Sequence, residues 1–165
     1  MLTSILLALL ISASSGYEAS ASAAPSEPLK VSVGNMSFSG DTIKLTKSVN
    51  GAFECEIEGR AEFTLGSDGD TDIAIAAQKL VISRNANDEI AIRCTGDCKL
   101  TDSEHTCSAD RMQIQLTKKI ELQLFGNSRV EFGTGDNRRA LAGESITFRG
   151  GAFSVSGAAL LKRAQ

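Results

Sequence analysis

A strict alternation of apolar and polar residues constrains the fold of this chain more than any other feature of its sequence. From Phe53 to Leu65 every second residue is apolar or small, and the residues between them include four glutamates and one arginine. Similar alternation recurs between Leu80 and Phe148. A period of two places successive side chains on opposite faces of an extended strand. No segment has a convincing helical period, so we expect an all-β protein.

Turn-forming residues separate the alternating segments. They occur at residues 67–70, 85–88, 133–137 and 150–151. Both prolines, Pro25 and Pro28, precede this region, so proline interrupts none of the later strands. A length of 165 residues suits one domain with a core of its own, and we place a single β domain at residues 30–165.

Two sequence markers recur with nearly the same spacing. Segments that begin at Ala77, Ala109 and Ala142 resemble one another, and their first residues are 32 and 33 positions apart. Glycines within strands recur 30 and 31 positions apart, at Gly96, Gly126 and Gly157, and Gly59 is a more distant copy. Each unit of about 30 residues holds roughly two strands, which bury their apolar face only by stacking on further copies. A glycine within a strand suits a bend or bulge.

The N-terminal residues have the composition of an export signal. Residues 2–11 are almost continuously apolar, and Ala-Ser-Ala sequences follow at residues 19–21 and 21–23. We expect a signal peptide over residues 1–23, cleaved after Ala21 or Ala23, a flexible lead-in over residues 24–29 and a periplasmic location. An uncleaved anchor is the alternative, although the apolar run is shorter than the roughly 20 residues of a membrane span.

One of the repeats resembles a known family. Gly96-Asp97-Cys98-Lys99-Leu100, a polar turn and then Ala109-Asp110-Arg111 are similar to the repeat of the LptA/OstA-like family of periplasmic lipopolysaccharide-transport proteins. The resemblance covers roughly residues 53–161. It implies a curled, partly open β-jellyroll that carries lipid tails inside the fold, stacks end to end through edge strands and serves outer-membrane biogenesis. An LptC-like partner that keeps its N-terminal anchor is an alternative within the same fold.

If the resemblance holds, the apolar face of the alternating strands lines a groove for lipopolysaccharide or another acylated lipid. The candidate lining residues are Phe53, Ile57, Phe63, Ile82, Ile92, Met112, Ile114, Leu122, Leu124, Val130, Phe132, Ile146 and Phe148. The alternative is that these residues fill a closed core. Open sheet edges at residues 30–33 and 153–161 would instead allow self-assembly or strand addition by a partner, as in a structural scaffold.

Four cysteines, an even number, favour disulfides in an exported chain. If the chain is extended from Cys94 to Cys98, these residues stand roughly 13 Å apart, too far for a bridge unless Gly96 folds the chain back. We favour Cys98–Cys107, which flank a polar turn, together with Cys55–Cys94. A zinc site formed by three of these cysteines and His105 is disfavoured by its irregular spacing.

Composition argues against several other classes of function. A net charge of −3 and a single tyrosine with no tryptophan argue against nucleic-acid binding and aromatic stacking platforms. The chain has one histidine and no nucleophile motif or phosphate loop, so we expect neither an enzyme nor a cofactor.

Overall fold

The structure is a computed structural model of the chain. It describes residues 17–22, 27–47, 52–67, 70–87, 89–117, 120–133, 138–157 and 160–163. The described residues form twelve strands: β1 (Tyr17–Ser22), β2 (Leu29–Val33), β3 (Met36–Gly40), β4 (Thr42–Lys47), β5 (Phe53–Ser67), β6 (Asp70–Arg84), β7 (Ile90–Asp102), β8 (His105–Leu116), β9 (Ile120–Phe132), β10 (Arg139–Arg149), β11 (Ala152–Ser156) and β12 (Leu160–Arg163). All belong to one open, antiparallel sheet, and none of the described residues is helical, so the all-β prediction is confirmed.

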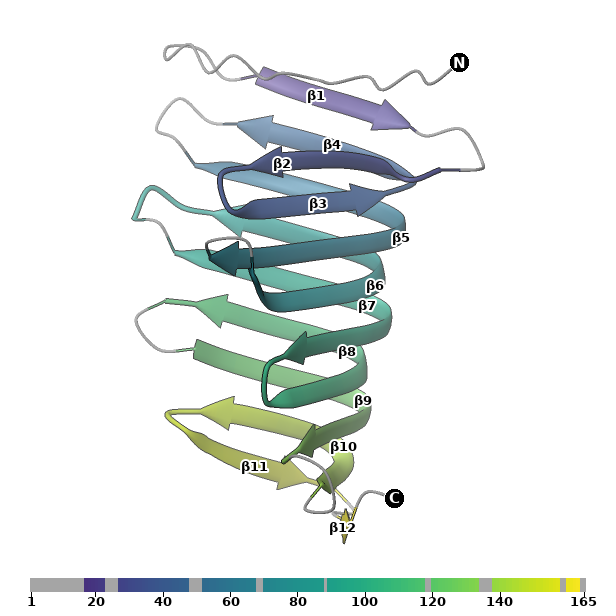
Figure 1. The fold of residues 1–165 in the computed structure, drawn as a ribbon, viewed down its shortest axis with the longest axis vertical. Helices are drawn as coiled ribbons and strands as arrows, with labels where there is room; N and C mark the ends of the chain where they lie inside the picture. Colours follow the sequence, from purple (N-terminus) through teal and green to yellow (C-terminus); the bar gives the residue numbers. More distant parts are fainter. Residues whose placement is uncertain are drawn as a thin grey trace.

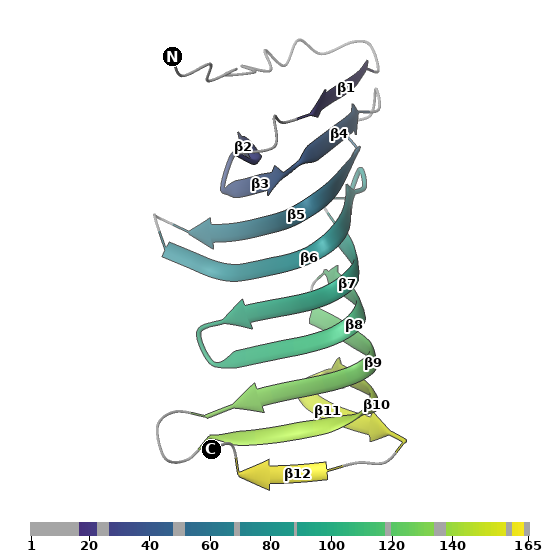
Figure 2. The same cartoon turned by 90° about the vertical axis from the view of Figure 1, so that its right-hand side faces the viewer.

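The sheet curls into two facing walls because each of the strands β5 to β10 bends in the middle (Figure 1). Wall A contains β1, β4, β11 and one arm of each bent strand, and wall B contains β2, β3, β12 and the other arms. The arms in wall A are residues 53–58, 79–84, 90–95, 111–116, 120–125 and 145–149, and those in wall B are residues 61–67, 70–77, 98–102, 105–109, 128–132 and 139–143. Figure 2 shows the bends following one another along one side of the molecule.

Each bend in β5, β7 and β9 is a β-bulge made by a glycine and the residue after it. The φ angles are 68° and 47° at Gly59 and Arg60, 77° and 49° at Gly96 and Asp97, and 71° and 47° at Gly126 and Asn127. Each pair lies opposite one residue of the following strand, which is Gln78, Asp110 or Glu144. Glycine adopts positive φ without a steric penalty, and Asp and Asn tolerate it better than most residues. Gly59, Gly96 and Gly126 therefore bend their strands as expected, whereas Gly157 lies just after the end of β11, with a φ angle of 84°.

A row of polar side chains follows the outside of the bends. Arg60 binds the Asp41 carboxylate, with Nε 2.8 Å from Oδ1. In the next repeat Gln78 Nε2 donates to Asp97 Oδ2 at 2.9 Å. Asn127 Nδ2 then donates to Asp110 Oδ2 at 3.0 Å. The side chain that follows each glycine thus bonds to the preceding strand, so the same contact holds successive bends together.

The bends also correct the alignment of the third repeat. Ala77 and Ala109 each precede the single residue opposite a bulge, but in β10 this place belongs to Gly143 and not to Ala142. The copies are therefore 32 and 34 positions apart. A Cβ atom at Gly143 would overlap the side chain of Val155 in β11, which is a physical reason for glycine there.

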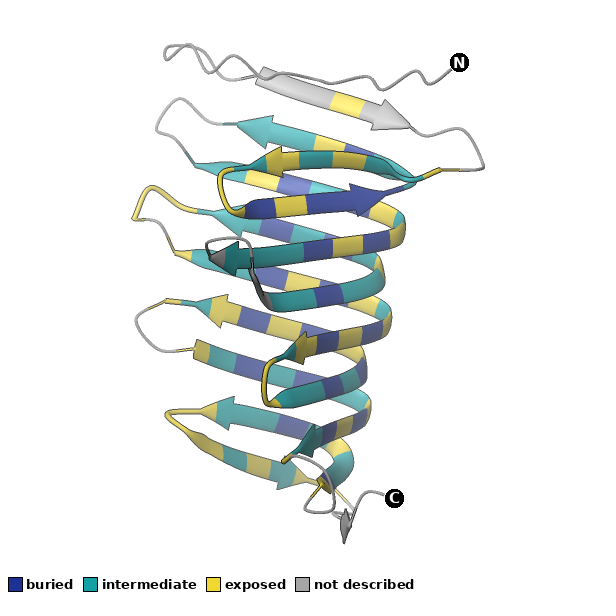
Figure 3. Ribbon diagram, in the orientation of Figure 1, coloured by how far each residue is buried: buried dark blue, intermediate teal, exposed yellow. Residues whose placement is uncertain are grey.

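Burial alternates along most of the bent strands, most clearly along β7 and β8, as Figure 3 shows. The apolar side chains point into the space between the walls, and the charged side chains that alternate with them point to solvent. On the outer face Lys79 binds both Glu56 and Glu58, and Arg149 binds Glu121 at 2.9 Å. Exposed ion pairs of this kind each contribute less than about 1 kcal/mol, so the stability comes mainly from the apolar side.

Part of the expected signal peptide is a strand in the structure. Residues 17–22 form β1 and pair with β4 from Tyr17 opposite Lys47 to Ser22 opposite Thr42, whereas the rest of residues 1–23 lies outside the described residues. The expected lead-in ends at Leu29, where β2 begins. Within the described part of the chain no helix is long and apolar enough to cross a membrane.

Candidate binding surface between the two walls

The thirteen expected lining residues all lie on the inward parity of β5 to β10. Cross-strand pairing arranges them in rows, for example Ile82 beside Ile92, Ile92 beside Ile114 and Ile114 beside Leu122. A similar row in wall B includes Phe63 and Val130. Five other buried residues also point inward but were not among the expected lining residues: Phe38, Ile43, Ile75, Leu80 and Leu100. The alternation of apolar and polar residues indicates their inward orientation too.

Most of the expected lining residues form a closed core in this structure. Ten of the thirteen are between 0% and 6% exposed, and Ile57, Phe63 and Leu124 are 0% exposed. Phe38 and Phe63 pack with their ring centroids 5.5 Å apart. The side chains of the two walls therefore fill the space near the bends, as the closed-core alternative expects.

Apolar residues farther from the bends remain partly exposed along the two open rims. We call these residues the apolar rim: Phe53, Ile90, Leu116 and Ile120 in wall A, and Leu65, Ile73 and Phe132 in wall B. Ile120 is 49% exposed and lies opposite Leu116 in the ladder. Rows of partly exposed apolar side chains on two facing walls suit a binding surface.

An aromatic cluster closes the space between the rims at the C-terminal end. Phe153 of β11 stacks on Phe132 of wall B, with centroids 6.3 Å apart, and packs on Phe148 at 4.8 Å. The His105 ring lies 6.1 Å from Phe153 and its Nδ1 is 3.2 Å from Asp102 Oδ1. We call Phe132, Phe148, Phe153 and His105 the aromatic clasp, because it joins wall A to wall B.

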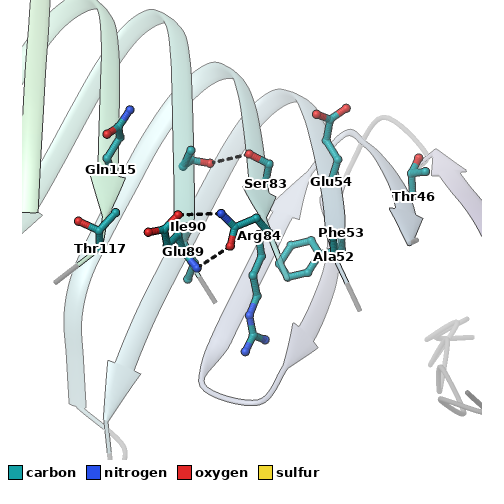
Figure 4. Close-up of a pocket in the computed structure, with 12 residues that line it drawn as sticks. Thr46, Ala52, Phe53, Glu54, Ser83, Arg84, Glu89, Ile90, Gln115 and Thr117 are labelled. Atoms are coloured by element: carbon teal, nitrogen blue, oxygen red, sulfur yellow. Dashed lines mark hydrogen bonds between the residues drawn. The ribbon is translucent and has the colours of Figure 1, made fainter. Parts of the chain in front are cut away.

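A depression of about 410 Å³ lies at the free ends of the wall A strands (Figure 4). Outward residues Glu54, Ser83 and Gln115 line one part of it, and Phe53 and Ile90 of the apolar rim line another. Ser83 Oγ donates to the carbonyl of Ala91 at 3.5 Å within this site. The depression therefore straddles the rim of wall A and does not extend into the core.

The four cysteines are buried free thiols, and the register places neither expected pair directly opposite each other. Cys98 faces Ala109, and Cys107 faces Leu100 and Val130. Cys55 faces Ile82 in β6, so a whole strand separates it from Cys94 in β7. The expected pairings of Cys98–Cys107 and Cys55–Cys94 stay predictions for the oxidised protein.

The bend changes the distance argument for Cys94 and Cys98. The separation estimated for an extended strand does not apply, because Gly96 and Asp97 turn the chain between them. Each thiol is the largest influence on the other: their side-chain hydrogen bond raises the pKa of Cys94 and lowers that of Cys98. Burial alone raises the pKa of Cys55 to about 12, so that thiol stays neutral.

The described residues contain no group of three or more His, Cys, Asp and Glu side chains placed to hold a metal ion. The expected edges lie at the ends of the sheet. Among the described strands, β2 pairs only with β3, and β11 and β12 pair only with β10.

Comparison of the chain with protein-family models, curated proteins and solved structures gives no match.

Proposed function

We propose that this protein binds the acyl chains of a lipid between the rims of its two walls. The observation that carries the proposal is the apolar rim, which presents partly exposed apolar side chains on both walls above a largely apolar interior. The resemblance noted in the sequence favours lipopolysaccharide as the class of lipid, and transport in the periplasm as the setting. A binding role without catalysis or a cofactor fits the same surface.

The way the walls are joined supports this proposal. Backbone ladder bonds run along each wall, and the described backbone connects the two walls only through the bends. Moving the rims apart therefore breaks side-chain contacts but no ladder bond. An acyl chain replaces those contacts with its own, at about 0.8 kcal/mol for each buried methylene.

Native mass spectrometry of gently extracted protein tests the proposal, together with uptake of a fluorescent fatty acid. We expect bound lipid in the wild type. Ile90→Asn with Leu116→Asn should lower probe affinity at least tenfold, because both side chains belong to the apolar rim. The matched control is Ala91→Asn with Gln115→Asn, which changes the adjacent, outward residues of the same strands.

Partly exposed rim positions serve this test better than interior ones. A charge at Ile114, which is 2% exposed, is expected to unfold the protein whether or not lipid binds. Absence of lipid from the native protein, with no probe uptake by the wild type, would remove the proposal.

A structural role in assembly is the second candidate, and the single-partner strands β2, β11 and β12 favour it. It predicts oligomers that depend on protein concentration and contain no lipid. Proline substitutions within residues 30–33 or 153–156 should abolish them. The same native mass spectra distinguish the two candidates, because bound lipid and a second copy of the chain add different masses.

The proposed export is tested separately. N-terminal sequencing of the protein from its host should begin at Ser22 or Ala24 if the leader is cleaved as expected. An intact N-terminus would favour the anchored, LptC-like alternative.

A further inference from the structure

Two buried thiols, Cys94 and Cys98, lie on either side of the bend in β7. Cys94 belongs to the wall A arm and Cys98 to the wall B arm, and each is 1% exposed. The bulge of Gly96 and Asp97 turns the strand between them, so both side chains point into the interior from different walls.

The other bends show that these two positions converge for structural reasons. Ile57 and Ala61 hold the equivalent places in β5, and Leu124 and Ser128 hold them in β9. All four residues are buried. A small residue follows the bend in both cases, which is expected where two side chains meet on the inside of a corner.

Cys98 differs in acidity from the other three cysteines. Hydrogen bonds from the Cys94 thiol and the Met112 backbone lower its pKa. It is therefore the thiol that ionises first and acts as the nucleophile in disulfide exchange. By contrast, the hydrogen bond to Cys98 and burial raise the pKa of Cys94, and burial raises the pKa of Cys55 and Cys107 to about 12.

We propose that Cys94 and Cys98 form a disulfide across the bend of β7 when the chain folds in an oxidising environment. The Cys98 thiolate attacks the disulfide of an exchange partner, such as oxidised glutathione or a dithiol oxidase, and one partner thiol leaves. The Cys94 sulfur then attacks the Cys98 sulfur of the mixed disulfide, and its proton passes to the second partner sulfur, which leaves as a thiol. Two thiols lose two protons and two electrons, and the partner disulfide is reduced.

This bridge ties wall A to wall B at the level of β7. In the reduced protein the Cys98 thiol donates to the carbonyl of Asp110, at 3.4 Å, and the disulfide forgoes that bond. The bend in β5 forms without any such bond, because Ala61 has no donor to offer. The geometry of the bend is therefore compatible with the oxidised pair.

Tryptic peptide mapping tests the proposal directly, because trypsin leaves the two proposed partners in one peptide and the other two cysteines in separate peptides. Cleavage after Arg93 and Lys99 leaves Cys94 and Cys98 in one peptide, whereas Cys55 lies in peptide 48–60 and Cys107 in peptide 100–111. The full chain is refolded in a glutathione redox buffer, alkylated and digested. Peptide 94–99 should then be lighter than its reduced form by two hydrogen atoms and carry no alkyl group.

Variants make the assignment specific. The double variant Cys55→Ala with Cys107→Ala should keep the bridge, whereas Cys98→Ser should leave Cys94 open to alkylation. Ser128 fills the same place in β9, so we expect Cys98→Ser to fold, and circular dichroism checks it. Peptide 94–99 linked to peptide 48–60 or 100–111 would overturn the proposal in favour of the other pairings, as would full alkylation of the refolded wild type. Neither result bears on lipid binding.

Discussion

Cys98 and Ser128 occupy equivalent positions, two residues after the bending glycines of β7 and β9. Cys98 Sγ donates to the carbonyl of Asp110 at 3.4 Å, and Ser128 Oγ donates to the carbonyl of Glu144 at 3.3 Å. In both cases the acceptor belongs to the single residue opposite the bulge. A bulge disturbs the regular ladder, so a side-chain donor here supplies a bond that the ladder does not.

The first prediction concerns this donor in the reduced protein. Cys98→Ser should keep the free energy of unfolding within about 0.5 kcal/mol of the wild type, because the hydroxyl replaces the thiol as donor. Cys98→Ala should lose about 1 kcal/mol, the usual net contribution of such a bond. Urea unfolding in reductant measures both, and equal stability of the two variants would show that the bond contributes nothing.

The second prediction concerns alkaline pH. Burial raises the pKa of Cys55 and Cys107 from 9.0 to about 12, so these thiols remain protonated in the fold while the unfolded chain ionises. Stability is therefore complete below pH 9 and falls as pH rises from 9 towards 12, by up to about 1.4 kcal/mol per pH unit for each thiol.

Urea unfolding of the reduced protein between pH 8 and 10.5 measures this slope. Cys55→Val with Cys107→Val should make it shallower, because neither valine titrates, and the raised pKa of Cys94 accounts for part of the remaining slope. A slope unchanged by the double variant would place its origin elsewhere in the protein.

At the scale of the strand, the bend is a repeated element whose sequence signal is short. A glycine with the same parity as the core, inside an alternating segment, marks it in β5, β7 and β9. The alternation predicts the strands, and the spacing of the glycines predicts the bends. The sequence left open whether Gly96 folds the chain back between Cys94 and Cys98, because the alternation does not indicate that Asp97 also has a positive φ.

The third prediction tests the bend in β7. Gly96→Ala should destabilise the protein by about 3 kcal/mol, because φ is +77° and the new Cβ would lie 2.5 Å from Gln78 Oε1. Gly34→Ala is the matched control: its φ is +60°, but a Cβ there meets nothing within 4 Å. It should cost only the backbone strain, about 1 kcal/mol. Equal losses in thermal unfolding would mean that Gln78 yields to the methyl group.

The fourth prediction concerns charge pairing between β5 and β6. A hydrogen bond and the charge of Lys79 lower the pKa of Glu56 below its ordinary value of 4.5. The pair therefore adds stability above that value and loses it as pH falls through the lowered pKa. Lys79→Met should raise the pKa of Glu56 towards its ordinary value, and an NMR titration measures this change. The same substitution should leave stability at pH 7 almost unchanged, since both side chains are substantially exposed.

At the scale of the whole molecule, depth in the core depends on distance from the bend. Residues beside a bend, such as Ile57, are fully buried, whereas Phe53 at the end of the same arm reaches the apolar rim. Parity is identical at both positions, so the sequence pattern alone did not separate core from rim. Strand β1 was missed for another reason: its residues share the composition of an export leader.

The fifth prediction follows from the pairing of strands only with their neighbours. Deletion of residues 85–116 removes β7 and β8, one complete unit, and leaves β6 to pair with β9 as β8 now does. The shortened chain should keep a β-type circular dichroism spectrum and a cooperative unfolding transition. Its urea m-value should fall with the surface that is lost. Loss of cooperativity would show that the strands depend on contacts beyond their neighbours.

The open side of the sheet has a consequence for how such a molecule changes in size. In a closed barrel, a strand added to the ring changes the circumference and so the shape of everything inside. Here an added pair of arms extends the long axis and leaves the profile across the two walls as it was. Length and cross-section are therefore independent quantities in this architecture, and the number of units can vary while the width between the walls stays constant.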